Sequence, residues 1–139
     1  MIIIGNWERV YMLFESIHHI AIIGRNYNKT KEFYVKKLGF KIISEYHRVD
    51  KNDIIINVKK ENVVLEIFIK EDAPLRSPMP NPENTGLRHL AFKVKNVEKI
   101  LAEFDRLNIE HQGLRYDDFD GKKMAFFFDP DGLPLEIHE

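Results

Sequence analysis

The feature that most constrains the fold of this chain is an internal repeat with an offset of 70 residues. The segment Ile17–Ile22 (IHHIAI) matches Leu87–Phe92 (LRHLAF), and Leu65–Ile67 (LEI) matches Leu135–Ile137 (LEI) at the same offset. Two separate matches at one shift indicate a duplicated structural unit rather than chance similarity. The chain is therefore predicted to fold as two copies of one unit.

Each half has the same predicted order of elements, namely one strand, one helix and three strands. A helix is predicted over residues 28–38, with Asn28 as its cap and Gly39 just after its end, and a second helix begins at the cap Asn96. Asp129–Gly132 (DPDG) fits a type I turn. The predicted strands, which are rich in β-branched residues, cover residues 17–24, 40–47, 53–60 and 63–69 in the first half and 87–95, 109–116, 122–128 and 133–138 in the second. The prediction is thus two βαβββ units.

The repeat also predicts the domain limits. A chain of 139 residues with 44% hydrophobic content is of a usual size for a single domain. We expect one domain over 16–139, made of a module 16–71, a linker 72–86 and a module 87–139. The linker carries four prolines, which cannot donate ladder hydrogen bonds and so argue against a strand. Residues 1–15 lie outside the repeat and are interpreted as an N-terminal extension.

Composition excludes several classes of function and of metal site. Lysine and arginine number 21 against 22 acidic residues, so no basic excess favours nucleic-acid binding. Cysteine is absent, and a metal site would therefore use histidine and carboxylate ligands. The apolar run Met1–Ile4 ends at Gly5 and predicts neither a signal peptide nor a membrane span. We expect a cytoplasmic protein with no nucleic-acid or membrane partner.

Four polar residues recur at matched places in the two halves: His19 and Glu66 in the first, His89 and Glu136 in the second, each pair 47 residues apart. Side chains alternate along a strand, so these residues lie opposite the apolar side chains expected to pack on the helices. Alone, a strand histidine or glutamate is more often a hydrogen-bonded structural residue. Two inward carboxylates, however, are costly unless they are paired or bound to a cation. We interpret the four residues as ligands of one divalent metal in a common concave interior.

One further histidine, His138, shares the predicted inner face with Glu136. It could hydrogen-bond to that glutamate and orient it toward the metal, as residues next to metal ligands often do. It could equally be part of a frayed chain end.

The histidine and glutamate segments, together with Asp129–Gly132 leading into Leu135–Glu136, resemble the vicinal oxygen chelate superfamily, in particular its glyoxalase I branch. The resemblance covers residues 16–139. It implies an α+β fold in which two βαβββ modules form a cup-shaped, eight-stranded structure around a metal. The four candidate ligands fall on the positions that supply the metal ligands in that superfamily.

The resemblance implies a metal-dependent isomerase of the lactoylglutathione lyase type, acting in methylglyoxal detoxification. Its substrate would be the hemithioacetal of a 2-oxoaldehyde and a thiol, or a related small carbonyl compound. By similarity, Glu136 is the main acid/base and Glu66 its partner. A divalent cation can stabilise the enediolate left when a proton is removed beside a carbonyl. A six-coordinate site with two histidines and two carboxylates suits Ni, Zn or Co.

The chain departs from the glutathione-dependent members at two positions. Those members carry an arginine four residues after the first ligand and an asparagine four after the second, where this chain has Ile23 and Lys70. The thiol partner is therefore left open, although Lys70 could attract an anion. Arg76 and Arg115 are further candidates for an anionic substrate, and surface solvation explains each of them as well.

Two other functions stay open as alternatives. A metal-dependent epimerase uses similar proton chemistry, but that branch resembles a glutamine at the position of Glu66. A small-molecule-sequestering binding protein of the same superfamily often lacks metal ligands. We expect a small-molecule substrate and a homodimer, and the long linker 72–86 allows the cup to close within one chain or between two.

Overall fold

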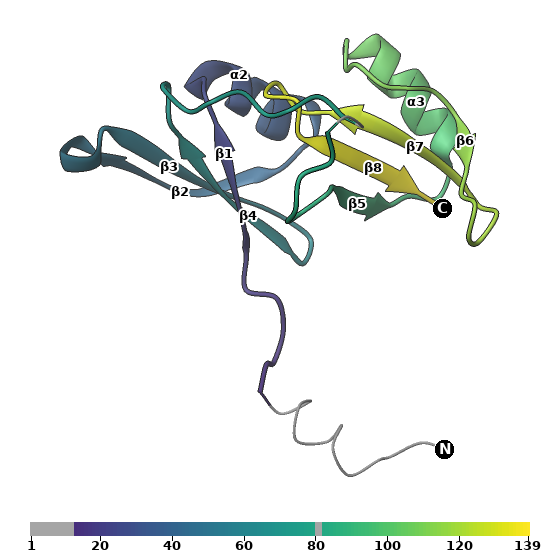
Figure 1. Ribbon diagram of the computed structural model, residues 1–139, viewed down its shortest axis with the longest axis horizontal. Coiled ribbons are helices and arrows are strands. Elements are labelled where there is room, and N and C mark those ends of the chain that lie inside the picture. The colour runs from purple at the N-terminus through teal and green to yellow at the C-terminus, as the bar shows by residue number, and fades with distance from the viewer. Residues whose placement is uncertain (1–12, 80–81) are drawn as a thin grey trace.

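The computed structural model describes residues 13–79 and 82–139 (Figure 1). The first half contains β1 (Ile20–Gly24), α2 (Tyr27–Lys31), the π-helix η1 (Glu32–Lys37), β2 (Lys41–Arg48), the 3₁₀-helix η2 (Val49–Lys51), β3 (Asp53–Lys60) and β4 (Val63–Ile69). The second half contains β5 (Leu90–Lys93), α3 (Val97–Arg106), β6 (Arg115–Tyr116), β7 (Lys123–Phe128) and β8 (Pro134–His138). The two halves have the same order of strands and helices.

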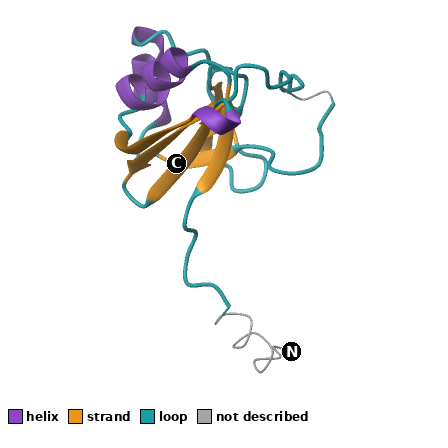
Figure 2. Cartoon of the chain, turned by 90° about the vertical axis from the view of Figure 1, so that its left-hand side faces the viewer, coloured by secondary structure: helices purple, strands orange, loops and turns teal. Residues whose placement is uncertain are grey.

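The eight strands form two four-stranded sheets with matching topology. The order is β1-β4-β3-β2 in one sheet and β5-β8-β7-β6 in the other. In each sheet the first strand runs parallel to the last, and the other neighbours are antiparallel. α2 and α3 lie on one side of the sheets (Figure 1), and Figure 2 shows this from a second direction. The predicted α+β fold of two βαβββ modules is confirmed.

Two local predictions differ from the structure. The cap of the first helix lies two residues earlier than expected, because Asn26, and not Asn28, accepts the hydrogen bond from Lys29 N with its side chain. The predicted strand 109–116 is reduced to β6 and an isolated bridge between His111 and Phe127. Gly113 lies between them with φ +82°. This left-handed backbone interrupts the ladder, although the segment still runs beside β7.

Burial separates the two faces of the first sheet. On β4, Leu65, Ile67 and Ile69 are buried in the core, while Glu66 and Phe68 on the opposite face are half-buried. The alternation arises because successive side chains of a strand point to opposite faces. The face that carries Glu66 is therefore the one turned away from the core.

The turn between β7 and β8 joins the two halves of the chain. The Tyr34 hydroxyl donates to Asp129 Oδ2 at 2.7 Å, and both residues are buried. The backbone N–H of Arg25, just after β1, donates to the Asp131 carboxylate at 3.3 Å. Asp129 O accepts from Gly132 N at 3.0 Å, as the predicted turn requires. The two modules share one apolar core beside this turn.

The chain before β1 leaves the body of the molecule as an extended segment (Figures 1 and 2). Leu13, Phe14 and Ile17 are 69%, 80% and 77% exposed. The predicted extension 1–15 lies for the most part outside the described residues. None of the helices in the described ranges is long and apolar enough to cross a membrane.

Candidate metal centre

The first pair of predicted ligands meets at the edge of β4. Ala21 is the register partner of Glu66, and His19 precedes Ala21 by two residues on the same face. This pairing brings His19 Nε2 to 3.9 Å from Glu66 Oε1. The other ring nitrogen, Nδ1, lies 2.8 Å from Nδ1 of His18. The nitrogen that faces the glutamate is thus Nε2.

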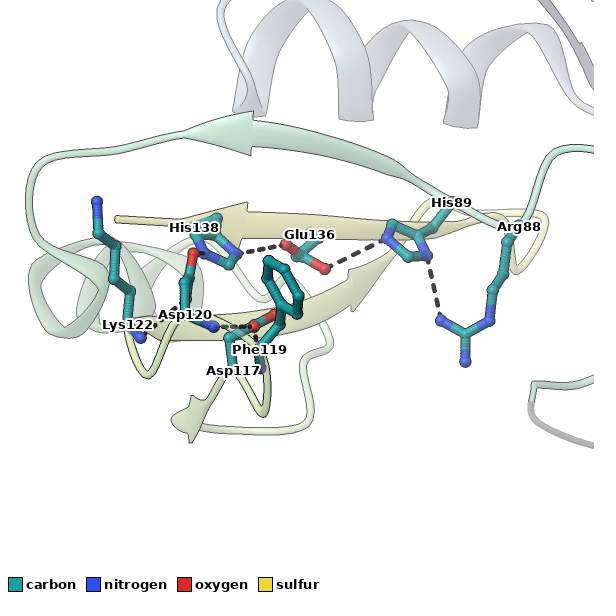
Figure 3. Close-up of polar contacts among 8 residues, drawn as sticks. All are labelled: Arg88, His89, Asp117, Phe119, Asp120, Lys122, Glu136 and His138. Carbon is teal, nitrogen blue, oxygen red and sulfur yellow. Dashed lines mark hydrogen bonds and ion pairs between the residues drawn. The ribbon is translucent and has the colours of Figure 1, made fainter. Parts of the chain in front are cut away.

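The second pair repeats this geometry on β8. Ala91 is the register partner of Glu136, and His89 Nε2 lies 3.3 Å from Glu136 Oε1. Nδ1 of His89 lies 3.3 Å from the guanidinium of Arg88 (Figure 3). The imidazole also packs edge-on against Phe126, with 5.2 Å between ring centroids. In both halves, the preceding side chain contacts Nδ1, and Nε2 faces the glutamate.

The donor atoms of these pairs fit a divalent metal. Ligand distances of 2.0–2.2 Å place neighbouring donors of one octahedral ion about 3 Å apart. The nitrogen-to-oxygen distance of the second pair, 3.3 Å, is close to this spacing, and the 3.9 Å of the first pair is somewhat wider. Imidazole nitrogen and carboxylate oxygen are ligands that Ni, Zn and Co accept. Each pair is suited to be half of a metal site.

The two pairs do not meet within one chain. Across residues 13–79 and 82–139, no three of the four predicted ligands offer atoms that all lie within 4.8 Å of one another. One pair belongs to the sheet of β1 to β4, and the other belongs to the sheet of β5 to β8. The four-ligand metal site therefore stays a prediction.

One histidine behind the second pair has a defined role in the structure. His138 Nδ1 lies 2.8 Å from Glu136 Oε2, and His138 Nε2 lies 2.8 Å from Asp120 Oδ2 (Figure 3). A neutral imidazole has one N–H donor, so two ionised carboxylates at this distance favour the doubly protonated ring. Accordingly, Asp120 and then Glu136 raise the pKa of His138 above its usual range. His138 thus holds one oxygen of Glu136 and leaves the other facing His89.

The loop before β7 holds Asp120 in place. The Lys122 backbone N–H and then His138 lower the pKa of Asp120 below its usual range. Asp117 Oδ1 accepts from the backbone N–H groups of Phe119 and Asp120 at 2.7 and 2.9 Å. Asp117, Asp120 and His138 form the one group of three possible ligand side chains in the described ranges. Their hydrogen bonds order the loop and support Glu136 from behind.

The two glutamates differ in their surroundings. The Glu136 side chain is 9% exposed, and the Glu66 side chain is 27% exposed. The residue that corresponds to His138 in the first half is Phe68, which has no hydrogen-bonding group. Glu136 is therefore buried and hydrogen-bonded, whereas Glu66 lies on an open face.

Three charged residues lie in a row on the same face of the sheet as Glu66, beyond the far end of β4. Arg48 pairs with Asp53 across β2 and β3, with Nε 2.7 Å from Oδ1 and Nη2 2.5 Å from Oδ2. Lys70 Nζ donates to Asp53 Oδ2 at 3.0 Å. Arg48, and next Lys70 by hydrogen bonding, lower the pKa of Asp53 to about 2. Sequence reasoning considered Lys70 but missed Arg48 and Asp53, because their position beside Lys70 depends on the register of β2, β3 and β4.

The two other cations considered from the sequence have different surroundings. The Arg76 guanidinium donates to the Leu87 carbonyl at 3.1 Å. Arg115 lies over the ring of Phe126, 5.7 Å from its centroid. Arg115 therefore lies beside the second pair of ligands, whereas Arg76 braces the linker.

A cleft of about 580 Å³ lies under the linker, lined by residues of β1, the linker and the start of β8. None of the four predicted ligands lines this cleft, but Ala21 and Arg88, each within two residues of a predicted histidine ligand, do. The cleft is therefore adjacent to the candidate centre rather than part of it.

Two mixed sheets of the βαβββ type, each with a histidine and glutamate pair at corresponding positions, define a class of duplicated folds. The sequence model of the glyoxalase/bleomycin resistance protein/dioxygenase superfamily matches residues 16–137. The chain belongs to this superfamily.

Two relatives match nearly the whole chain. The uncharacterized protein YwkD of Bacillus subtilis is 45% identical over 129 residues, which are 92% of this chain and 99% of the relative. The crystal structure of a glyoxalase family protein from Enterococcus faecalis has 55% identity and a TM-score of 0.87, covering 92% of this chain and 100% of that chain. The fold and the family are thus shared with proteins of high identity.

More distant solved structures share the fold alone. A trypanothione-dependent glyoxalase I from Leishmania major has 20% identity and a TM-score of 0.69, covering 91% of this chain and 87% of that one. The fosfomycin resistance protein FosX from Listeria monocytogenes, solved in mutant form with Mn(II) and a dihydroxypropylphosphonic acid, has 18% identity and a TM-score of 0.72, covering 91% and 92%. Structures of this fold therefore include a glyoxalase I and a protein that binds a divalent metal.

Proposed function

We propose that this protein is a metal-dependent isomerase of the glyoxalase I type, acting on the thiol adduct of a 2-oxoaldehyde or on a related small carbonyl compound. The observation that carries the proposal is the repeated pair of an imidazole Nε2 and a glutamate Oε1, at 3.9 Å in one sheet and 3.3 Å in the other. Glyoxalase I from Leishmania major and FosX with Mn(II) share the fold and support both the reaction class and the metal.

We propose His19, Glu66, His89 and Glu136 as the residues that hold one Ni, Zn or Co ion. A bound divalent cation supplies Lewis-acid stabilisation of the negative charge that develops on substrate oxygens. The chain itself supplies the nitrogen and oxygen donor atoms. They lie on the faces of the two sheets that are turned away from the core. The second pair is the more preorganised half, since Glu136 is buried and hydrogen-bonded.

Glu136 is the proposed acid/base. It would take the proton from the carbon next to the carbonyl and return it to the carbonyl carbon, while the hydroxyl proton of the first carbon passes to the former carbonyl oxygen. One C–H and one O–H bond break, one of each forms, and there is no net gain or loss of electrons. The hydrogen bond from His138 to Oε2 restricts rotation of this carboxylate and keeps Oε1 on the side of His89. Restricted geometry of this kind favours proton transfer. Glu66 is the proposed partner on the opposite side of the substrate.

We further propose that the centre is completed in a homodimer. Each half-site lies on a separate sheet, and in the described ranges no three of the four ligands offer atoms within 4.8 Å of one another. Large apolar side chains near the first pair are exposed, among them Phe14 at 80% and Ile17 at 77%. A second copy could cover these side chains and bring its own His89 and Glu136 pair opposite the first.

The thiol partner proposed here is not glutathione in the usual binding mode. Ile23, at the position of the expected arginine, is an exposed apolar residue, and Lys70, at the position of the expected asparagine, donates one hydrogen bond to Asp53. A different thiol or a different anionic carbonyl compound is consistent with these side chains.

Reconstitution and turnover test the proposal. Metal-free protein would be loaded separately with Ni, Zn and Co and assayed with methylglyoxal and a panel of thiols. Glu136→Gln should lower kcat by roughly 10²–10⁴-fold, the usual range for loss of a general acid/base. Glu103→Gln, a matched change on the exposed face of α3, should leave kcat unchanged. A metal-loaded protein that converts none of the adducts would exclude the isomerase proposal.

A further inference from the structure

The open face of the first sheet is organised in rows that run across the strands. Register pairs place Ser44, Asn57 and Glu66 in one row, since Ser44 faces Asn57 and Asn57 faces Glu66. Residues that are paired across neighbouring strands point to the same side of the sheet. The metal-ligand row on this face is thus the row of Glu66.

The next row is apolar. Phe68 follows Glu66 by two residues, and its register partners are Ile55 on β3 and Ile23 on β1. Tyr46 on β2 continues the row as the partner of Ile55. Ile23 and Tyr46 are 55% and 56% exposed. This second row presents an accessible apolar floor beside the ligand row.

The third row contains two cations that share one carboxylate. Arg48 and Asp53 are register partners two residues beyond Tyr46 and Ile55, and Lys70 lies two residues beyond Phe68. Asp53 accepts from both cations and has no exposed side-chain surface. Asp53 raises the pKa of the Arg48 guanidinium, and Asp50 and Glu66 also lie close enough to raise it. Arg48 and Lys70 therefore place two cationic side chains, next to several carboxylates, at this end of the face.

Both cations keep donors that Asp53 does not use. A guanidinium has five N–H donors, and Arg48 commits Nε and Nη2 to the carboxylate. An ammonium has three N–H donors, and one of them from Lys70 goes to Asp53. Their side chains are 28% and 39% exposed. Asp53 thus fixes the two cations side by side, with unused donors accessible to a ligand.

The spacing of the rows gives the length of a ligand that could span them. Strands rise about 3.3 Å per residue, so Glu66 and Lys70 are roughly 13 Å apart along β4. The guanidinium of Arg48 lies over the ring of Phe68, 5.4 Å from its centroid, and so connects the apolar and cationic rows. A ligand across this face would need an oxygen head, an apolar middle and an anionic tail.

We infer that Arg48 and Lys70, held together by Asp53, form a subsite for an oxyanion on the substrate, with Phe68 beneath the apolar part. The substrate class is then an anionic carbonyl compound whose carboxylate, phosphate or phosphonate is separated from the reacting carbon by an apolar segment. As a substrate assignment this inference rests on the proposed function, but the subsite itself can be tested without turnover.

The test is a titration of the metal-free protein with phosphate and, separately, with phenylphosphonate and benzoate, followed by ¹H–¹⁵N NMR. All three should give saturable shifts confined to β2, β3 and β4, and phenylphosphonate should bind more tightly than phosphate because of the apolar row. The comparison of phenylphosphonate with benzoate distinguishes a phosphonate from a carboxylate tail. Saturable shifts elsewhere, or none at these strands, would overturn the inference.

Two variants make the test specific. Lys70→Gln should weaken phenylphosphonate binding about tenfold, and Lys99→Gln, the same charge change on the exposed face of α3, should not. Arg48→Lys keeps the charge but loses the two-pronged contact with Asp53, and should also weaken binding. Equal weakening by Lys99→Gln would mean a general charge effect and would overturn the subsite. If the protein binds phenylphosphonate at these strands but converts no thiol adduct, the subsite is supported and the isomerase proposal is rejected.

Discussion

His138 Nδ1 lies 2.8 Å from Glu136 Oε2, whereas the residue at the same interval after Glu66 is Phe68. The two halves are thus alike in their ligand pairs and different in what supports them. Glu136 has a fixed orientation before any metal binds, and Glu66 has the freedom of a half-exposed side chain. This difference is the basis for assigning the acid/base role to Glu136.

The first prediction concerns that support. His138→Phe, which makes the second half match the first, should lower metal affinity or kcat by roughly 10–100-fold, the usual effect of losing a residue behind a ligand. His138→Gln, which can still donate one hydrogen bond, should recover part of the loss. Metal titration and the separate effects on kcat and KM measure it. A His138→Phe protein with unchanged metal affinity and kcat would contradict the positioning role.

The repeat was sufficient to predict the order of strands and helices along the chain, because the matched segments indicate the same order of elements in both halves. The predicted strands 53–60 and 63–69 coincide with β3 and β4, and Asn96 caps α3 as expected. The first cap was wrong because Asn26 and Asn28 both fit a capping pattern, and only the backbone geometry selects Asn26.

Other parts of the site depend on contacts that cannot be predicted from the periodicity of the sequence. Asp120 reaches His138 from a loop, and no strand or helix pattern predicts where a loop aspartate will point. The row of Arg48, Asp53 and Lys70 requires the register of β2 and β3, which becomes known only from the structure. Convergence of the four predicted ligands likewise depends on how the two sheets are placed relative to each other, within one chain or between two chains.

A second prediction tests the link between the two modules. Tyr34→Phe removes the hydroxyl that donates to the buried Asp129 Oδ2 at 2.7 Å. Losing one partner of a buried hydrogen bond costs about 1–3 kcal/mol. The free energy of unfolding in urea should fall by that amount, and Tyr116→Phe, on an exposed tyrosine, should leave it unchanged. Equal unfolding free energies for Tyr34→Phe and the wild type would exclude this link as a source of stability.

A third prediction concerns acid stability. Arg48, and next Lys70, lower the pKa of Asp53 to about 2, below the value of about 3.9 for an unfolded chain. The lowered pKa means that Asp53 stabilises the native state above about pH 4, and that this stabilisation disappears as the pH falls through about 2. The stability difference between the wild type and Asp53→Asn should therefore shrink between pH 5 and pH 2. Urea unfolding at a series of pH values measures it, and a constant difference would contradict the ion pair.

A fourth prediction addresses how the centre is completed. One variant would lack the first pair (His19→Ala with Glu66→Ala), and the other would lack the second pair (His89→Ala with Glu136→Ala). Neither alone should bind the metal. After unfolding and refolding together, mixed dimers should regain one ion per dimer, because one of the two shared sites then has all four ligands. An absence of metal in verified mixed dimers would mean that the ligands do not come from two chains.

The central claim is that two histidines and two glutamates from the repeated modules hold one divalent ion. It is tested most directly by measuring the metal content of protein that has been dialysed against Ni, Zn or Co, together with the four single alanine variants. The account predicts one ion per chain in the wild type and a large loss of affinity at each of His19, Glu66, His89 and Glu136. A wild type that binds no ion, or a bound ion that survives all four substitutions, would contradict it.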